Sequence, residues 1–299
     1  MDIHQSEDMA VPRTIEIDLY RDRVEICRTE LIRFGYAIAG IIDDAELMRI
    51  YLNVCHRLVS VHPRQILKSK DFSCSPEHQG SLTQIERVTR NGGDLTPYLS
   101  RKILNAEYND PLLNDWGIHH LHLGANTERD GFVSRTGPLL FCRFEDEKAY
   151  FIDVLKHGSW TMQRLLETMH ENWPGLLSQF QLHGVKGDRL TDRQIETLRN
   201  KRLNYCIEMK DGTVYGPPGG GITSAGTNMI DVAKADYIFF SAQKEQQRII
   251  DNIEEIAADA HRQGVVLPDP ARFRLRDIDG QFYAVEVNSK IGVPLDSLS

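Results

Sequence analysis

Three histidines stand within four positions of the segment WGIHHLHLG, residues 116–124. In a β-strand successive side chains point to opposite faces, so His120 and His122 would share one face while Leu121 and Leu123 share the other. If the leucines face a core, the two histidines lie side by side on the opposite face. Two imidazoles placed in this way can act as a general base and a general acid near neutral pH, or as two ligands of a metal.

More polar side chains follow in AYFIDVLK, residues 149–156, whose alternation is typical of another strand. On a period of two, Asp153 and His157 share one face of this strand. Arg135 opens the segment between the two strands, RTGPLLFCRF. If the registers match, the carboxylate and the third imidazole lie on the same polar face as the histidine pair, with the arginine beside them.

Such a cluster suits cleavage of RNA without a metal. One histidine of the pair His120 and His122 would remove the proton of the 2'-hydroxyl, and another would protonate the leaving 5'-oxygen. Arg135 or Lys156 would stabilise the negative charge of the phosphorane. Asp153 would orient one imidazole and fix its tautomer. The leading prediction is therefore a metal-independent endoribonuclease that binds RNA and needs no cofactor.

These segments, the HLHL strand, RTGPLLFCRF, and KAYFIDVLKHG with the helix after it, resemble the small RNase toxins of the RelE and barnase-like group. The resemblance covers about residues 105–178. In that group the sheet carries catalytic arginine, lysine and histidine residues, and the resemblance implies these roles for Arg135, Lys156 and His157. A toxin-like or anti-phage defence function would also imply an inhibitory protein partner.

Two other functions fit the same residues. In the first, the chain is a metal-dependent hydrolase in which His120 and His122, with Asp153 or His157 from across the sheet, supply three or four ligands to zinc, manganese or iron. In the second, it is a non-catalytic binding or regulatory protein whose histidines make structural hydrogen bonds. The sequence leaves these alternatives open.

Composition and charge limit the class of protein and the cellular compartment that we expect. The 299 residues are 41% hydrophobic and 26% charged, which is typical of a globular protein, and the net charge of -8 argues against a protein that coats nucleic acid nonspecifically. A local basic site is still expected between residues 61 and 104, where basic side chains exceed acidic ones. The five cysteines are scattered and odd in number, and no long apolar run or signal peptide is found, so we expect a cytoplasmic protein without a membrane partner.

Hydrophobic periodicity predicts an α+β protein in three consecutive segments. Residues 1–60 would form a mainly helical part, residues 61–182 a central antiparallel sheet with a covering helix, and residues 190–299 a C-terminal α+β domain. Within the central segment, residues 69–93 are polar and typical of a loop. A single long helix over residues 232–263 would also suit a homodimer.

Two further motifs carry weaker signals. The glycine-rich loop at residues 215–228 precedes a helix but lacks the lysine of a phosphate-binding loop, which favours a structural crossover or a lid. The R-x4-6-H spacing of HEPN ribonucleases occurs at Arg57 to His62 and at Arg164 to His170. That spacing is permissive enough to arise by chance among 11 histidines.

Overall fold

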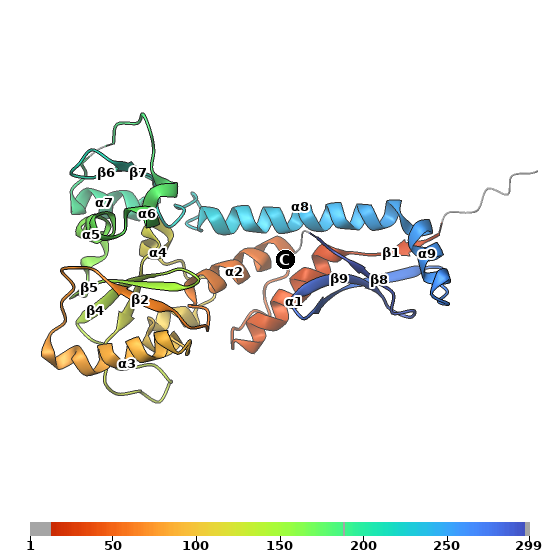
Figure 1. Cartoon of the computed structure of the whole chain (residues 1–299), viewed down its shortest axis with the longest axis horizontal. Coiled ribbons are helices and arrows are strands. Elements are labelled where there is room, and N and C mark those ends of the chain that lie inside the picture. Colours follow the sequence, from red (N-terminus) through yellow and green to blue (C-terminus); the bar gives the residue numbers. More distant parts are fainter. Residues whose placement is uncertain (1–12, 188, 297–299) are drawn as a thin grey trace, which may run out of the picture. The chain divides into compact units, whose positions relative to one another are not determined.

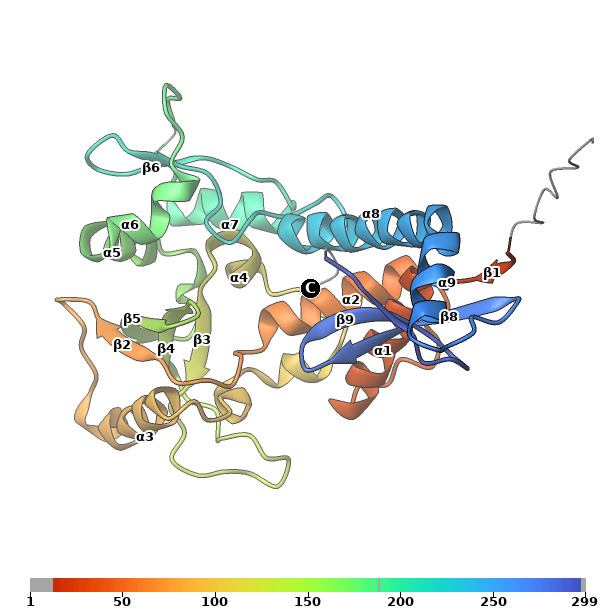
Figure 2. The ribbon, with the colours of Figure 1, turned by 45° about the vertical axis from the view of Figure 1, so that its right-hand side comes forward.

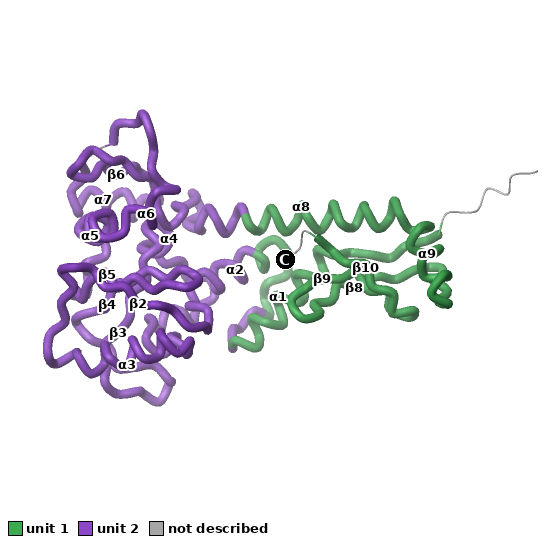
Figure 3. Tube along the Cα trace, in the orientation of Figure 1, with its two compact units in different colours: residues 1–34, 39–48, 234–299 green, residues 35–38, 49–233 purple. Residues whose placement is uncertain are grey.

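The computed structural model describes residues 13–187 and 189–296, and it is a mixed α+β protein, as the sequence predicts (Figure 1). The chain forms two compact units (Figure 3). Unit 1 comprises residues 1–34, 39–48 and 234–299, and unit 2 comprises residues 35–38 and 49–233. Unit 2 is thus inserted into unit 1 along the chain, whereas the segments predicted from the sequence are consecutive.

Unit 2 contains a four-stranded sheet in the order β2-β5-β4-β3. Its strands are β2 (Gln65–Lys68), β3 (His119–His122), β4 (Pro138–Phe144) and β5 (Lys148–Lys156). The pairs β3 with β4 and β4 with β5 are antiparallel, as the predicted central antiparallel sheet requires, and β2 adds a parallel edge beside β5.

Helices cover both faces of this sheet, so unit 2 has two hydrophobic cores (Figure 2). On one side, which we call the first core, α3 (Gln79–Arg90) packs Leu82 and Ile85 against Leu121 and Leu123 of the histidine strand. The expectation of a loop over residues 69–93 was therefore wrong. The helix has few apolar residues, but they fall at helical spacing and all face the sheet.

The second core lies on the other face of the sheet. Its helices are α4 (Pro111–Trp116), α5 (Arg164–Asn172), α6 (Pro174–Leu177) and α7 (Asp192–Asn200). A short hairpin of β6 (Ile207–Glu208) and β7 (Val214–Tyr215) adds to it. Short 3-10 turns connect the elements: η1 (Pro76–His78), η2 (Thr96–Tyr98), η3 (Arg101–Leu104), η4 (Ser159–Thr161) and η5 (Ser178–Phe180).

A β-bulge interrupts the alternation of β5. Phe141 pairs with Asp153 while the next residue, Cys142, pairs with Phe151, so Ile152 is the extra residue. As a result, Phe151 and Val154 both pack against the first core although they are three positions apart. The strict period of two predicted for this strand does not hold across the bulge.

Unit 1 contains a second four-stranded sheet, in the order β1-β8-β9-β10, and its own hydrophobic core. The strands are β1 (Ile15–Glu16), β8 (Ala271–Ile278), β9 (Gln281–Glu286) and β10 (Gly292–Pro294), and the helix α1 (Leu19–Arg33) belongs to the same unit. The predicted helix 232–263 is in fact two helices, α8 (Met229–Asp251) and α9 (Ile253–Arg262), which separate at Asn252. Two helices cross from one unit to the other, α8 and α2 (Asp44–Arg57).

Candidate active site

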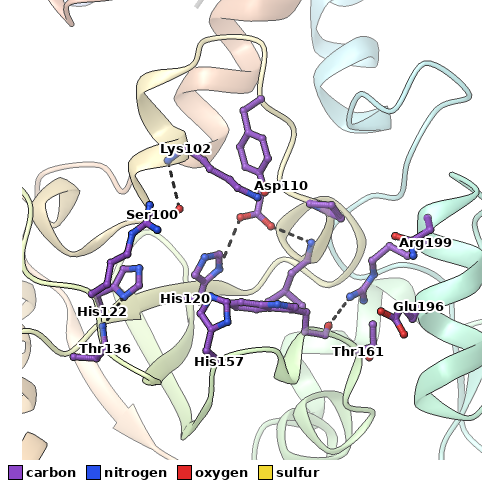
Figure 4. A pocket seen from close by; sticks show the side chains of 16 residues that line it. Ser100, Lys102, Asp110, His120, His122, Thr136, His157, Thr161, Glu196 and Arg199 are labelled. Atoms are coloured by element: carbon purple, nitrogen blue, oxygen red, sulfur yellow. Dashed lines mark hydrogen bonds and ion pairs between the residues drawn. The ribbon is translucent and has the colours of Figure 1, made fainter.

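A cavity of about 470 Å³ lies within unit 2 (Figure 4). Three parts of the chain line it. The histidine strand and the ends of β4 and β5 supply one wall, residues 100–112 supply the second, and η4 with α7 supplies the third. The cavity is therefore built from segments that are far apart in the sequence.

The structure brings His120, His122 and His157 together at this cavity, and Arg135 lines it with them. On β3 the leucines that alternate with the histidines pack in the first core, so the predicted division of faces is confirmed. His157 follows the last residue of β5, and its backbone N–H donates to the carbonyl of Gly137 before β4. Arg135 lies in the loop just before β4 rather than on the strand itself.

His120 faces a carboxylate that the sequence interpretation missed. The Oδ2 atom of Asp110 lies 3.8 Å from Nδ1 of His120, and this nitrogen is buried without a hydrogen bond to any residue that the structure describes. Burial lowers the pKa of His120, with help from the nearby charges of His157 and Lys102, whereas Asp110 acts in the opposite direction. Its imidazole is therefore neutral near pH 7, with a carboxylate behind Nδ1.

Asp110 is held by the helix that it caps. Its side chain accepts from the backbone N–H groups of Leu112 (3.0 Å) and Leu113 (3.2 Å), and Pro111 occupies the first helical position of α4. The pattern Asp-Pro is a signal for the start of a helix, so α4 could have been located from the sequence. Nothing in the sequence, however, places this cap beside the histidine strand.

His122 has a different environment. Its Nδ1 accepts from the backbone N–H of Thr136 at 3.4 Å, so the proton of the neutral ring belongs on Nε2. Burial, together with His120 and Arg135, lowers the pKa of His122 to about 4. At neutral pH this side chain is a hydrogen-bond donor at Nε2 and not a base there. The two histidines of the strand are therefore chemically distinct.

Trp160 joins the histidines to α7. Its ring centroid lies 4.6 Å from that of His120 and 5.0 Å from that of His157. Its carbonyl accepts from Arg199, whose guanidinium also binds the buried carboxylate of Asp115 at 2.6 Å and 2.9 Å. This buried ion pair fixes the position of α7, which supplies part of the third wall of the cavity.

The loop that carries Lys102 and Asp110 is anchored from α2. Arg57 is 3% exposed and donates to the carbonyls of Asn105 (2.9 Å) and Ala106 (3.0 Å), and burial lowers its pKa. Asn53, one turn earlier, donates to the carbonyls of Ala106 and Tyr108. Arg57 thus positions the loop.

Neither R-x4-6-H match forms a catalytic pair. The His62 ring binds the carbonyl of Asp146, away from Arg57, and His170 binds Asp211 and Tyr215. Both spacings are therefore accounted for by structural contacts.

Asp153 and Lys156 do not line the cavity. Asp153 is buried and pairs with Arg164 of α5 at 3.0 Å, and it also accepts from the backbone N–H groups of Ser73 and Val154. Lys156 is exposed at the end of β5. The carboxylate that faces a histidine of the cavity is therefore Asp110 and not Asp153, which is held by Arg164 of α5.

The basic stretch between residues 61 and 104 contributes one cation to the cavity, Lys102. Lys68 pairs with Glu86 at 2.7 Å, and Arg101 pairs with Glu128 at 2.6 Å. Arg135, from the loop before β4, lines the cavity together with Lys102.

The glycine-rich loop packs against α4 and is a structural crossover. The N–H of Gly219 donates to the carbonyl of Asp115 at 2.9 Å, and a Cβ atom at Gly219 would lie 2.2 Å from the carbonyl oxygen of Leu113. Arg143, which the sequence places on β4, donates to the carbonyl of Pro218 in this loop. The backbone of α4 therefore approaches too closely for any side chain at position 219.

Among residues 13–187 and 189–296, no group of three or more His, Cys, Asp or Glu side chains is arranged to hold a metal ion. In the same part of the chain, no helix combines the length and apolar content needed to cross a bilayer. Comparisons with protein-family models, curated proteins and solved structures find no match. The function is therefore inferred from the chemistry of the cavity.

Proposed function

We propose that this chain is an endoribonuclease that cleaves RNA through the 2'-hydroxyl by general acid and base chemistry, without a metal. The observation that supports this most is the convergence of His120, His122 and His157 with Lys102 and Arg135 on one cavity. The three imidazoles have different neighbours, and this allows them different roles.

His120 is the general base. With Asp110 behind Nδ1, the ring keeps its proton on that nitrogen and presents a lone pair at Nε2, the arrangement that a carboxylate imposes on a catalytic histidine. The 3.8 Å separation is longer than a hydrogen bond, and such contacts often tighten when substrate binds. Nε2 takes the proton of the 2'-hydroxyl while the 2'-oxygen forms a bond to phosphorus.

His157 is the general acid. It is exposed, and its ring lies near Trp160, as the ring of the base does. When the bond between phosphorus and the 5'-oxygen breaks, His157 donates its proton to that oxygen. The products are a 2',3'-cyclic phosphate and a free 5'-hydroxyl, and the proton taken by His120 balances the one given by His157.

His122, Lys102 and Arg135 bind the phosphate. His122 offers an Nε2–H donor, since its Nδ1 already accepts from Thr136. Lys102 and Arg135 line the cavity as cations. Donors aimed at the non-bridging oxygens stabilise the added negative charge of the phosphorane, and removing one such group typically costs about 10²–10³ in rate.

Cleavage of a labelled RNA tests the proposal. We expect the wild-type protein to cut it in EDTA and to leave 2',3'-cyclic phosphate ends, and we expect the double variant His120→Ala/His122→Ala to cut nothing. His170→Ala is the matched control, because His170 lies in the same unit and binds Asp211 and Tyr215 instead of lining the cavity. Cutting that EDTA abolishes would indicate a metal-dependent hydrolase, and an uncut RNA in every condition would favour a binding protein.

A further inference from the structure

We infer that the α7 end of the cavity is a nucleobase subsite, in which Glu196 selects a base with an exocyclic amino group over uracil. The inference rests on the proposed ribonuclease function. It concerns the base of the nucleotide whose 2'-hydroxyl attacks, because this base must lie beside the histidines.

The cavity has two chemically different ends (Figure 4). His122 and Thr136 lie at one end, while Glu196 and Thr161 lie at the other, beside Arg199. The histidine end has the donors and cations for a phosphate. A volume of about 470 Å³ exceeds what a phosphate fills and is in the range of sites for small organic molecules. The remaining space therefore adjoins the phosphate end and is open to the sugar and base.

α7 is rigidly placed at this end. Thr191 and Gln194 form a capping box at its start, and Ile195 is fully buried in the second core. Arg199, one turn later, is locked by Asp115. Two anchors four residues apart fix the rotation of a helix about its axis. The residues next to them, Glu196 and Asn200, are thereby held in the wall of the cavity.

Glu196 and Asn200 differ from Arg199 in having no assigned partner. Arg199 donates hydrogen bonds to Asp115, Trp160 and Tyr205. By contrast, neither Glu196 nor Asn200 makes a side-chain hydrogen bond or ion pair with any residue in the described part of the chain. Two polar side chains four positions apart thus remain available to a ligand.

The chemistry of Glu196 sets the preference. An ionised carboxylate only accepts hydrogen bonds. Cytosine presents an amino donor at C4, whereas uracil presents a carbonyl oxygen at the same position. A carboxylate facing that oxygen leaves both acceptors unpaired once the bound base has displaced the water between them, and this lowers the affinity for uracil. Trp160, which lies between the histidines and Arg199, offers an aromatic surface for the base.

Two chimeric oligonucleotides test the inference. Each is a short DNA strand with one ribonucleotide, cytidine in one and uridine in the other, so that each has a single 2'-hydroxyl. We expect wild-type kcat/KM to favour the cytidine substrate by about tenfold or more, the discrimination that one well-placed base contact supplies. In Glu196→Gln the ratio should fall toward one, since an amide also donates to the uracil oxygen. Glu171→Gln, an exposed change on α5 outside the cavity, should keep the wild-type ratio.

The outcomes separate this inference from the proposed function. Equal cleavage of both substrates, a preference for uridine, or a preference that survives in Glu196→Gln would overturn the base subsite and leave the ribonuclease intact. Failure of the wild-type protein to cut either chimera or a full-length RNA would instead overturn the ribonuclease. Glu196 is exposed on a helix, so the substitution does not threaten the fold.

Discussion

The carboxylate of Asp110 and the imidazole of His120 face each other across 3.8 Å, one from the N-cap of α4 and the other from the strand β3. Asp110 performs two tasks at once. It accepts from the first N–H groups of a helix, and it faces the buried Nδ1 atom of His120. Because capping and charge are separate properties, a substitution can remove one and keep the other.

Asp110→Asn should lower kcat on a saturating RNA substrate by about 10²-fold, the range of general acid and base terms, without lowering the melting temperature. Asparagine caps a helix as well as aspartate does, but it carries no charge. Since Asp110 raises the pKa of His120, its loss should also move the acid limb of the pH profile of kcat/KM to lower pH. Asp146→Asn, an exposed change, is the control. An unchanged kcat would remove Asp110 from the mechanism.

Arg135→Ala and Lys156→Ala form a matched pair. Arg135 lines the cavity and Lys156 does not. We expect Arg135→Ala to reduce kcat/KM by about 10²-fold through lost stabilisation of the phosphorane. Lys156→Ala should behave as wild type, contrary to the role that the toxin resemblance implies. Steady-state kinetics on one labelled RNA compares the two, and the reverse order of effects would contradict the assignment.

His119 makes the protein sensitive to acid. Its ring is buried, and burial, with help from His56 and His120, lowers its pKa to about 3. The unfolded chain, with an ordinary histidine pKa, binds a proton first, so stability is full above about pH 6.5 and is lost as the pH falls toward 3. For this one group the free energy of unfolding should drop by about 2 kcal/mol between pH 6.5 and pH 5.

Urea denaturation at these two pH values measures the effect. His119→Gln should shrink the difference in the free energy of unfolding between pH 6.5 and pH 5. His183→Gln, on an exposed loop, should leave it unchanged. If the free energy of unfolding depends on pH equally in wild type and His119→Gln, His119 is not the group that makes the protein sensitive to acid.

Gly219→Ala and Gly216→Ala probe the contact of the glycine-rich loop with α4. A Cβ atom at Gly219 would meet backbone atoms of Leu113, Gly117 and Asn114 at 2.2–2.7 Å, whereas one at Gly216 meets nothing nearer than 3.9 Å. Overpacking of this kind destabilises by about 1–3 kcal/mol, so Gly219→Ala should melt earlier than Gly216→Ala. Because α4 begins at its N-cap Asp110, the ribonuclease activity of Gly219→Ala should fall together with its melting temperature. Identical melting curves would rule out the tight contact.

The faces of the histidine strand could be predicted because β3 is short and regular, with one face packed in the first core and the other facing the cavity. Alternation then decides where every side chain points, and it separated Leu121 and Leu123 from His120 and His122. The same rule fails on β5. The bulge at Ile152 depends on pairing with β4, and pairing is not visible in a single strand's pattern.

The remaining site residues could not be found by local patterns. Lys102 and Asp110 lie in a polar loop, and Glu196 lies on the exposed side of a helix, where their types are ordinary. They become site residues through contacts across long stretches of chain, such as those of Arg57 with the carbonyls of Asn105 and Ala106. Patterns of a few residues carry no information on such contacts.

The insertion of unit 2 into unit 1 has a consequence for the order of folding. Ile15 of β1 pairs with Ala271 of β8, so the sheet of unit 1 must close a chain loop that contains the whole of unit 2. Closing a long flexible loop costs entropy that grows with its length. Within unit 2, His56 of α2 and Asp231 of α8 form an ion pair at 3.1 Å, at the two points where the chain leaves for unit 1. Once unit 2 has folded, that contact shortens the effective chain loop that the sheet of unit 1 must close.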